Sequence, residues 1–97
     1  MMRTIVLDCR LLTGATAEER YHSHELIADA FGFPPYYGRN LDALYDCLTD
    51  PCEETEVILT HADEAPDGYC ASVIRVMRDG AAENRNIKLF RASELTD

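Results

Sequence analysis

Two aspartates four residues apart, Asp42 and Asp46, are the side chains whose type and spacing best suit recognition of a cation. At about 100° per residue in a helix, Asp42, Asp46 and Thr49 fall within roughly 60° of arc, with Tyr45 beside them. An acid in the first helical turn complements the helix dipole, which explains Asp42 without any partner. Asp46 has no such explanation, because Asp is a poor helix former and like charges at i,i+4 repel. The pattern indicates either a surface that binds a basic partner or an ordinary solvated face.

The acidic residues are concentrated in the middle of the chain. The sequence has 18 acids against 9 Lys and Arg, a net charge of −9, and no Lys or Arg lies between Arg39 and Arg75. The acids in this gap are Asp42, Asp46, Asp50, Glu53, Glu54, Glu56, Asp63, Glu64 and Asp67. Because acids and bases balance in the rest of the chain, the gap carries the whole net charge. Such a field steers a basic protein and repels nucleic acid, although a solubilising surface has the same composition.

Two other kinds of site use these residue types. Paired carboxylates act as acid and base in glycosidases, but no histidine, nucleophile or oxyanion donor lies near Asp42 and Asp46 in the sequence. His22, His24 and His61 with nearby acids could bind zinc, but an H-x-H pair places its members on different helix faces. His24 lies on an apolar stripe, which is typical of a histidine satisfied in the core. We therefore expect no enzymatic activity, no metal and no cofactor.

The N-terminal sequence indicates a cytoplasmic protein, and this location sets the expected state of the cysteines. No stretch approaches the roughly 18 apolar residues of a membrane span, and the first apolar run, interrupted by Asp8 and Arg10, is too short for a signal peptide. Without export, the cysteines are expected to be free thiols that pack as small apolar residues, with a strained Cys47–Cys52 bridge as the alternative. The four cysteines are Cys9, Cys47, Cys52 and Cys70.

Three short apolar runs predict β-strands, at residues 4–8, 56–60 and 86–91. Helical patterns separate them, so the element order is β-α-α-β-α-β. Strands joined through helices require crossover connections, which gives an α/β fold with a three-stranded parallel sheet packed with helices. Because the runs are nearly continuous in apolar residues, we expect the buried strands of a sheet covered by helices. The chain has no repeats or linkers and forms one domain, residues 1–97.

Helix boundaries are predicted from capping residues. Thr16 and Glu19 form a capping-box pattern for the first helix, which Gly32 ends. Asn40 caps the second helix. The helices are predicted at residues 17–31, 41–49 and 69–83. A rigid, proline-containing turn is predicted at residues 33–38, and a loop or single helical turn at residues 61–66. In the second helix, the arc that faces the core contains Leu41, Leu44 and Leu48.

Residues 35–49, PYYGRNLDALYDCLT, resemble the signature of the barstar family. The family pattern reads Tyr-Tyr-Gly-x-Asn-Leu-Asp-Ala-Leu-aromatic-Asp-x-Leu, and so long an ordered match is specific. Residues 73–79, VIRVMRD, are similar to the family's last helix. The resemblance extends in element order and length over essentially all 97 residues.

The resemblance implies a monomeric, cytosolic inhibitor of a barnase-type, guanyl-specific ribonuclease that binds neither nucleic acid nor membrane. An acidic helix and the preceding loop would block the nuclease active site, where a carboxylate can take the phosphate position through charge-assisted hydrogen bonds. Asp42 and Asp46 would point at the enzyme's cations, Tyr45 and Thr49 would pack beside them, and Asp79 would add a peripheral acid. The loop and helix start would contribute Tyr36, Gly38, Asn40 and Leu41. The alternative is an acidic adaptor or immunity protein on the same fold that binds a different basic protein or toxin.

Three positions depart from the family pattern. Tyr45 stands where the family often has Trp, and Arg39 and Asp79 stand where it often has Glu. Arg39 places a positive charge beside the acidic patch. We expect this charge to weaken binding to a basic partner or to change its specificity.

Overall fold

The computed structural model describes residues 2–50 and 53–92, and it contains a three-stranded sheet with three helices. The elements are β1 (Arg3–Asp8), the 3-10 turn η1 (Cys9–Leu11), α1 (Ala17–Phe31), α2 (Leu41–Thr49), β2 (Thr55–Thr60), the 3-10 turn η2 (Ala62–Glu64), α3 (Tyr69–Glu83) and β3 (Ile87–Arg91). This order confirms the predicted α/β class and β-α-α-β-α-β sequence. The strands begin within one residue of the predicted positions, and the turn η1 was not predicted.

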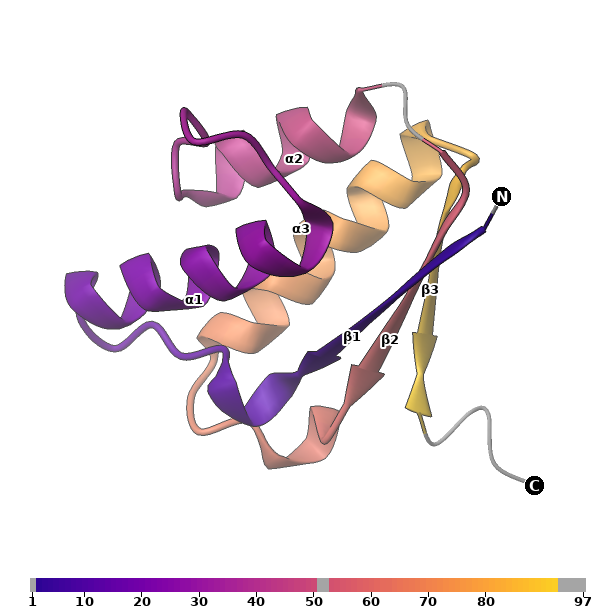
Figure 1. Cartoon of the computed structure of the whole chain (residues 1–97). Helices are drawn as coiled ribbons and strands as arrows, with labels where there is room; N and C mark the ends of the chain where they lie inside the picture. The colour runs from indigo at the N-terminus through magenta and orange to yellow at the C-terminus, as the bar shows by residue number, and fades with distance from the viewer. Residues whose placement is uncertain (1, 51–52, 93–97) are drawn as a thin grey trace.

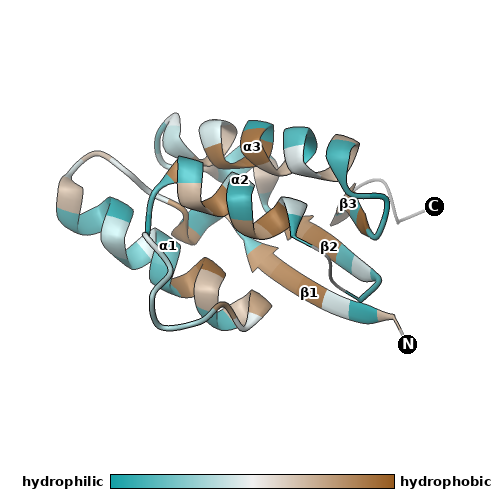
Figure 2. Ribbon diagram, turned by 90° about the horizontal axis from the view of Figure 1, so that it is seen from above, coloured by the Kyte–Doolittle hydropathy of each residue, from teal (hydrophilic) through white to brown (hydrophobic). Residues whose placement is uncertain are grey.

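The sheet is fully parallel, with β2 in the centre and β1 and β3 at its edges. Ile5 pairs with Val57, and Val57 pairs with Leu89, so these apolar residues form a row across one face. The helices all lie on this one side of the sheet, as seen in Figure 1 and from above in Figure 2. Their packing against the row buries the core.

The prediction that helices cover the strands is wrong for the second face of the sheet. In β1, Ile5 and Leu7 are buried, whereas Val6 between them is 59% exposed. Burial also alternates along β2, although less sharply. The three helices of the described residues all lie on the first side of the sheet, so none of them covers the second face. An apolar run can therefore mark a strand with one open face as well as one buried on both faces.

The capping signals are confirmed where the sequence placed them. The Thr16 hydroxyl accepts the Glu19 N–H at 3.1 Å, and Asn40 Oδ1 accepts the Ala43 N–H at 2.7 Å. These bonds satisfy backbone donors that have no partner within the helix. Gly32 ends α1 in the left-handed region with φ of 76°, where a side chain would be strained.

Helix α2 packs mainly against α3, and Gly80 makes this close approach possible. A Cβ atom at position 80 would lie 2.9 Å from the Leu48 Cβ. The Leu44 and Leu48 side chains are almost fully buried, and Leu41 is partly buried, which confirms the predicted core-facing arc. The opposite side of α2 is therefore held outward by well-packed leucines. None of the helices in the described part of the chain is long and apolar enough to cross a membrane.

Candidate partner-binding surface

The outward side of α2 carries Asp42 and Asp46, and both residues are exposed. Within residues 2–50 and 53–92, neither carboxylate forms an ion pair with Lys, Arg or His. Other acids of the described chain are paired, as Asp8 is with Arg10 at 2.8 Å. The Arg10 hydrogen bond lowers the pKa of Asp8 to about 2. The two α2 carboxylates thus present negative charge to solvent, and no cation among the described residues neutralises it.

Two further residues of the predicted site lie along the same helix. Tyr45 and Thr49 are partly buried, and the Thr49 hydroxyl donates to the main-chain oxygens of Tyr45 and Asp46 at 3.1 Å. This bonding back to the preceding turn holds the Thr49 side chain against the helix. The four side chains Asp42, Tyr45, Asp46 and Thr49 define what we call the α2 face.

The loop before α2 exposes one tyrosine of its adjacent pair and buries the other. Tyr36 is 87% exposed, whereas Tyr37 is 3% exposed. The Tyr37 ring lies 5.0 Å from the ring of Phe33, which in turn stacks on Phe31 at 5.0 Å. The buried ring anchors the loop to the core, so that Tyr36 is held outward next to the start of α2.

His24 connects this loop to the rest of the core. Its Nδ1 lies 2.6 Å from the Tyr37 hydroxyl and its Nε2 lies 2.6 Å from the Tyr69 hydroxyl. A neutral imidazole donates from one nitrogen and accepts at the other, so both nitrogens are satisfied by the two hydroxyls. Burial lowers the pKa of His24, which favours this neutral form. The prediction of a satisfied core histidine is confirmed, and the sequence did not identify its tyrosine partners.

Arg39 turns toward α1 and pairs with Glu25. Its Nε donates to the Glu25 carboxylate, its Nη1 donates to the Tyr37 carbonyl at 3.1 Å, and its guanidinium lies 5.1 Å from the centre of the Tyr21 ring. The hydrogen bond from Arg39 lowers the pKa of Glu25. Arg39 has a positive φ of 54°, in the left-handed region. Its positive charge is therefore largely balanced by Glu25.

Gly80 of α3 and Asn84 at its C-terminal end position α2, and no local pattern in the sequence predicted either role. Gly80 permits the contact with Leu48 described above. Asn84 Nδ2 donates to the carbonyl oxygens of Leu48 at 2.9 Å and Asp50 at 3.0 Å. These carbonyls belong to the last turn and cap of α2, where helical partners are missing. Asn40 thus holds the first turn of α2, and Asn84 holds the last.

The remaining predicted site residues lie at the two ends of this surface. Gly38 is exposed, and its carbonyl accepts the Asn40 side-chain amide at 3.2 Å, which closes the turn before α2. Leu41 packs partly against the core at the start of the helix. Asp79 is exposed on α3, beside Arg75 and Arg78. The structure therefore brings together the loop and α2 residues, and Asp79 belongs to a different helix.

The remaining predictions from the sequence concern the cysteines and a possible metal site. Cys9 and Cys70 are buried, Cys47 is partly buried, and all three are free. Burial raises the pKa of each, to about 12 for Cys70. The possible Cys47–Cys52 bridge lies outside the described residues. Within the described ranges, no three His, Cys, Asp or Glu residues are grouped so that they could hold a metal ion.

Comparison with known proteins agrees with this architecture. A sequence profile of the family described as Barstar (barnase inhibitor) matches residues 7–92. The chain therefore belongs to the barstar family. It is 48% identical over 48 residues to the Bacillus subtilis (strain 168) protein named "Putative ribonuclease inhibitor YrdF". That match covers 50% of this chain and 47% of the relative, so the chain spans about half the length of the curated relative it matches.

Proposed function

We propose that this protein inhibits a basic, barnase-type guanyl-specific ribonuclease, by inserting the α2 face and the preceding loop into the nuclease active site. The observation that carries the proposal is the pair Asp42 and Asp46, exposed on a firmly packed helix without an ion-pair partner among the described residues. Membership of the barstar family, and the name of the Bacillus subtilis relative, support inhibition of a ribonuclease as the role.

The chemistry of the two partners is complementary. A ribonuclease site binds the phosphates of its substrate through cationic side chains, and a carboxylate can accept the same charge-assisted hydrogen bonds. Because α2 is anchored at both ends by Asn40 and Asn84, its carboxylates are presented with little freedom to lose on binding. The net charge of −9 accelerates encounter with a basic enzyme. We propose that the protein acts as a cytoplasmic monomer and has no catalytic activity of its own.

The α2 face is flanked by residues that extend the contact. Tyr36 offers an almost fully exposed aromatic ring beside the helix start. Tyrosine is enriched among residues that dominate binding energy, because its ring is large and rigid and its hydroxyl can hydrogen-bond. Asp79 is proposed to add a peripheral acid from α3. Arg39 is neutralised by Glu25, so we expect it to oppose a basic partner less than its sequence position suggests.

The decisive experiment compares two double variants that remove the same charge from the same acidic third of the chain. The first is Asp42→Asn with Asp46→Asn on α2, and the second is Asp63→Asn with Glu64→Gln on η2. Inhibition of barnase is measured by RNA cleavage at low and high salt, with binding rates from surface plasmon resonance. The α2 variant should lose at least about a hundredfold in affinity at both salt concentrations, because hot-spot charges are desolvated in the complex.

The η2 variant should slow association at low salt, and high salt should remove its effect. Equal and small effects of the two variants would refute the role of the α2 face. If the folded wild-type protein does not inhibit barnase at all, the partner is another basic protein or toxin, and the barnase-type specificity is wrong.

A further inference from the structure

Glu25 lies on α1, outside the residues that the sequence placed in the binding surface, yet it contacts the loop that leads into α2. Its carboxylate accepts a hydrogen bond from the Nε of Arg39. Arg39 follows Gly38 in this loop and directly precedes Asn40, the residue that caps α2. The Glu25 side chain therefore joins α1 to the point at which the loop meets the acidic helix.

Arg39 is held at three points, and its main chain needs this support. Its Nε donates to Glu25, its Nη1 donates to the Tyr37 carbonyl at 3.1 Å, and its guanidinium lies 5.1 Å from the centre of the Tyr21 ring. The φ of 54° at Arg39 lies in the left-handed region, which residues with a side chain seldom adopt. Such a conformation persists only where surrounding contacts stabilise it. The three contacts therefore fix the main chain at Arg39.

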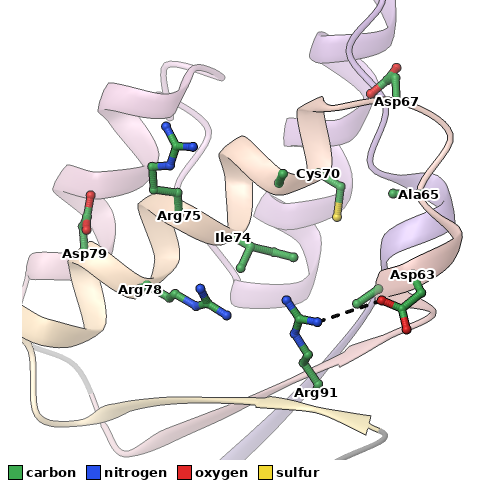
Figure 3. A pocket seen from close by; sticks show the side chains of 11 residues that line it. Asp63, Ala65, Asp67, Cys70, Ile74, Arg75, Arg78, Asp79 and Arg91 are labelled. Carbon is green, nitrogen blue, oxygen red and sulfur yellow. Dashed lines mark ion pairs between the residues drawn. The ribbon is translucent and has the colours of Figure 1, made fainter.

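Glu25 supplies the negative charge of this group of contacts. Hydrogen bonds from Arg39 and Tyr21 lower the pKa of Glu25, so its carboxylate is charged at neutral pH. A hydrogen bond between a carboxylate and a guanidinium is stronger than one between neutral groups. Not every exposed arginine is held in this way. Figure 3 shows Arg75 and Arg78 projecting from α3, and neither forms an ion pair with any residue that the structure describes.

The loop has few other contacts between its two anchors. The buried Tyr37 ring fixes one end, and the Asn40 cap of α2 fixes the other. Gly38 between them is exposed, and glycine has more conformational freedom to lose on ordering than any other residue. The contacts of Arg39 therefore decide whether this segment keeps one conformation. The exposed Tyr36 belongs to the same loop, so its presentation depends on the same contacts.

We propose that Glu25 is a positioning residue for partner binding: through Arg39, it holds the loop before α2 in the conformation that the ribonuclease contacts. The identity of the partner rests on the proposed function, whereas the order of the loop is a property of the free protein. A loop that is mobile in the free protein has to be ordered when the complex forms, and this cost reduces affinity. Arg39 thus contributes the shape of the loop, and its charge is balanced by Glu25.

The first test compares Glu25→Gln with Asp29→Asn in the free protein. Each variant removes one negative charge from α1, and Asp29 is exposed and forms no ion pair with any described residue. Order parameters are measured by ¹⁵N NMR relaxation. In Glu25→Gln, the values at the Gly38 and Arg39 amides should fall from the roughly 0.85 of a rigid backbone to about 0.6 or below. Asp29→Asn should leave them unchanged.

The second test measures inhibition of barnase at high salt, where steering by net charge is screened. Glu25→Gln should weaken inhibition about tenfold, because the loop then has to be ordered on binding. Asp29→Asn should change inhibition less than about twofold.

Arg39→Gln separates positioning from charge in the same assay. If the pair acted only through charge, Arg39→Gln would tighten inhibition of a basic enzyme and Glu25→Gln would weaken it. A positioning role predicts that both variants weaken inhibition. The double variant Glu25→Gln with Arg39→Gln should then lose no more than either single variant, because the two residues act as one unit.

Unchanged order parameters in Glu25→Gln would overturn the proposal, and so would tighter inhibition by Arg39→Gln. A mobile loop with full inhibition would overturn the role of Glu25 in binding and leave the proposed function intact. If the wild-type protein does not inhibit barnase, the barnase-type specificity fails separately. The order parameters still decide whether Glu25 positions the loop: a fall only in Glu25→Gln supports this role, and no difference from Asp29→Asn contradicts it.

Discussion

Asp46→Ala should move stability and binding in opposite directions. In the free protein, Asp46 lies in α2 four residues after Asp42, and it has no ion-pair partner among the described residues. Removing the like-charge pair should stabilise the fold by about 0.2–0.5 kcal/mol. Replacing Asp by Ala within a helix adds up to about 0.7 kcal/mol. We expect a gain of roughly 1 kcal/mol in the free energy of unfolding, which raises Tm by about 4–8 °C in a domain of this size.

The same substitution should weaken the complex with barnase. If Asp46 accepts hydrogen bonds from desolvated cations of the enzyme, its loss should cost at least about 2 kcal/mol of binding, or roughly a 30-fold rise in Kd. Much of this cost comes from leaving the enzyme's cations buried without a partner. Urea unfolding followed by circular dichroism measures the first quantity, and inhibition of RNA cleavage measures the second.

Asp29→Ala is the matched control, because Asp29 is also an exposed aspartate within a helix and lies on α1. It should raise stability by a similar amount and leave inhibition unchanged. A stabilised Asp46→Ala protein with unaltered inhibition would refute the binding role of this residue. A destabilised one would show that Asp46 has a structural role, and the reasoning from its unpaired charge would be wrong.

Three further predictions follow from the contacts that position the α2 face. Tyr37→Phe should lower the free energy of unfolding by about 1–3 kcal/mol, because it leaves a buried His24 nitrogen without a partner. Tyr36→Phe should have no measurable effect in the same urea titration, and equal effects of the two substitutions would contradict the assigned burial. Burial depresses the folded-state pKa of His24 below its ordinary value of 6.5, so its contribution to the free energy of unfolding should be fully present above this pH and should fall as the pH decreases through it. Urea unfolding between pH 8 and 5 should show a smaller fall in stability for His24→Gln than for wild type. An equal dependence of stability on pH in both proteins would refute the assignment. Gly80→Ala should lower the free energy of unfolding by about 1–3 kcal/mol, because the added methyl group clashes with Leu48, and should weaken inhibition by displacing α2. A Gly→Ala substitution at an open helix position increases stability, so an increase in the same urea titration would contradict this prediction.

Local signals made most of the fold predictable. A helix cap depends on residues within three or four positions, so Thr16, Gly32 and Asn40 located helix ends from the sequence alone. The 3.6-residue period separated the buried face of α2, with Leu44 and Leu48, from its acidic face. The order of strands and helices then favoured a parallel sheet, because each connection has to cross over. The α2 part of the candidate site was predictable for the same reason, since one helix carries it.

Contacts between distant segments could not be predicted in this way. The sequence did not indicate that one face of the sheet stays open, because an apolar run in a strand does not show how many layers cover it. Nor did it indicate that His24 joins Tyr37 to Tyr69 across three segments of the chain. Arg39 looked like an opposing charge until packing placed it against Glu25.

The sequence by itself determined the local conformation of the three described helices and three strands, and the charge that α2 carries. Only the tertiary structure decided which charges remain available for a partner. It pairs Arg39 with Glu25 on α1, and it leaves Asp42 and Asp46 exposed on α2. The physical reason is that helix caps and periodicity act over a few residues, whereas the neutralisation or exposure of a charge depends on every segment that packs around it.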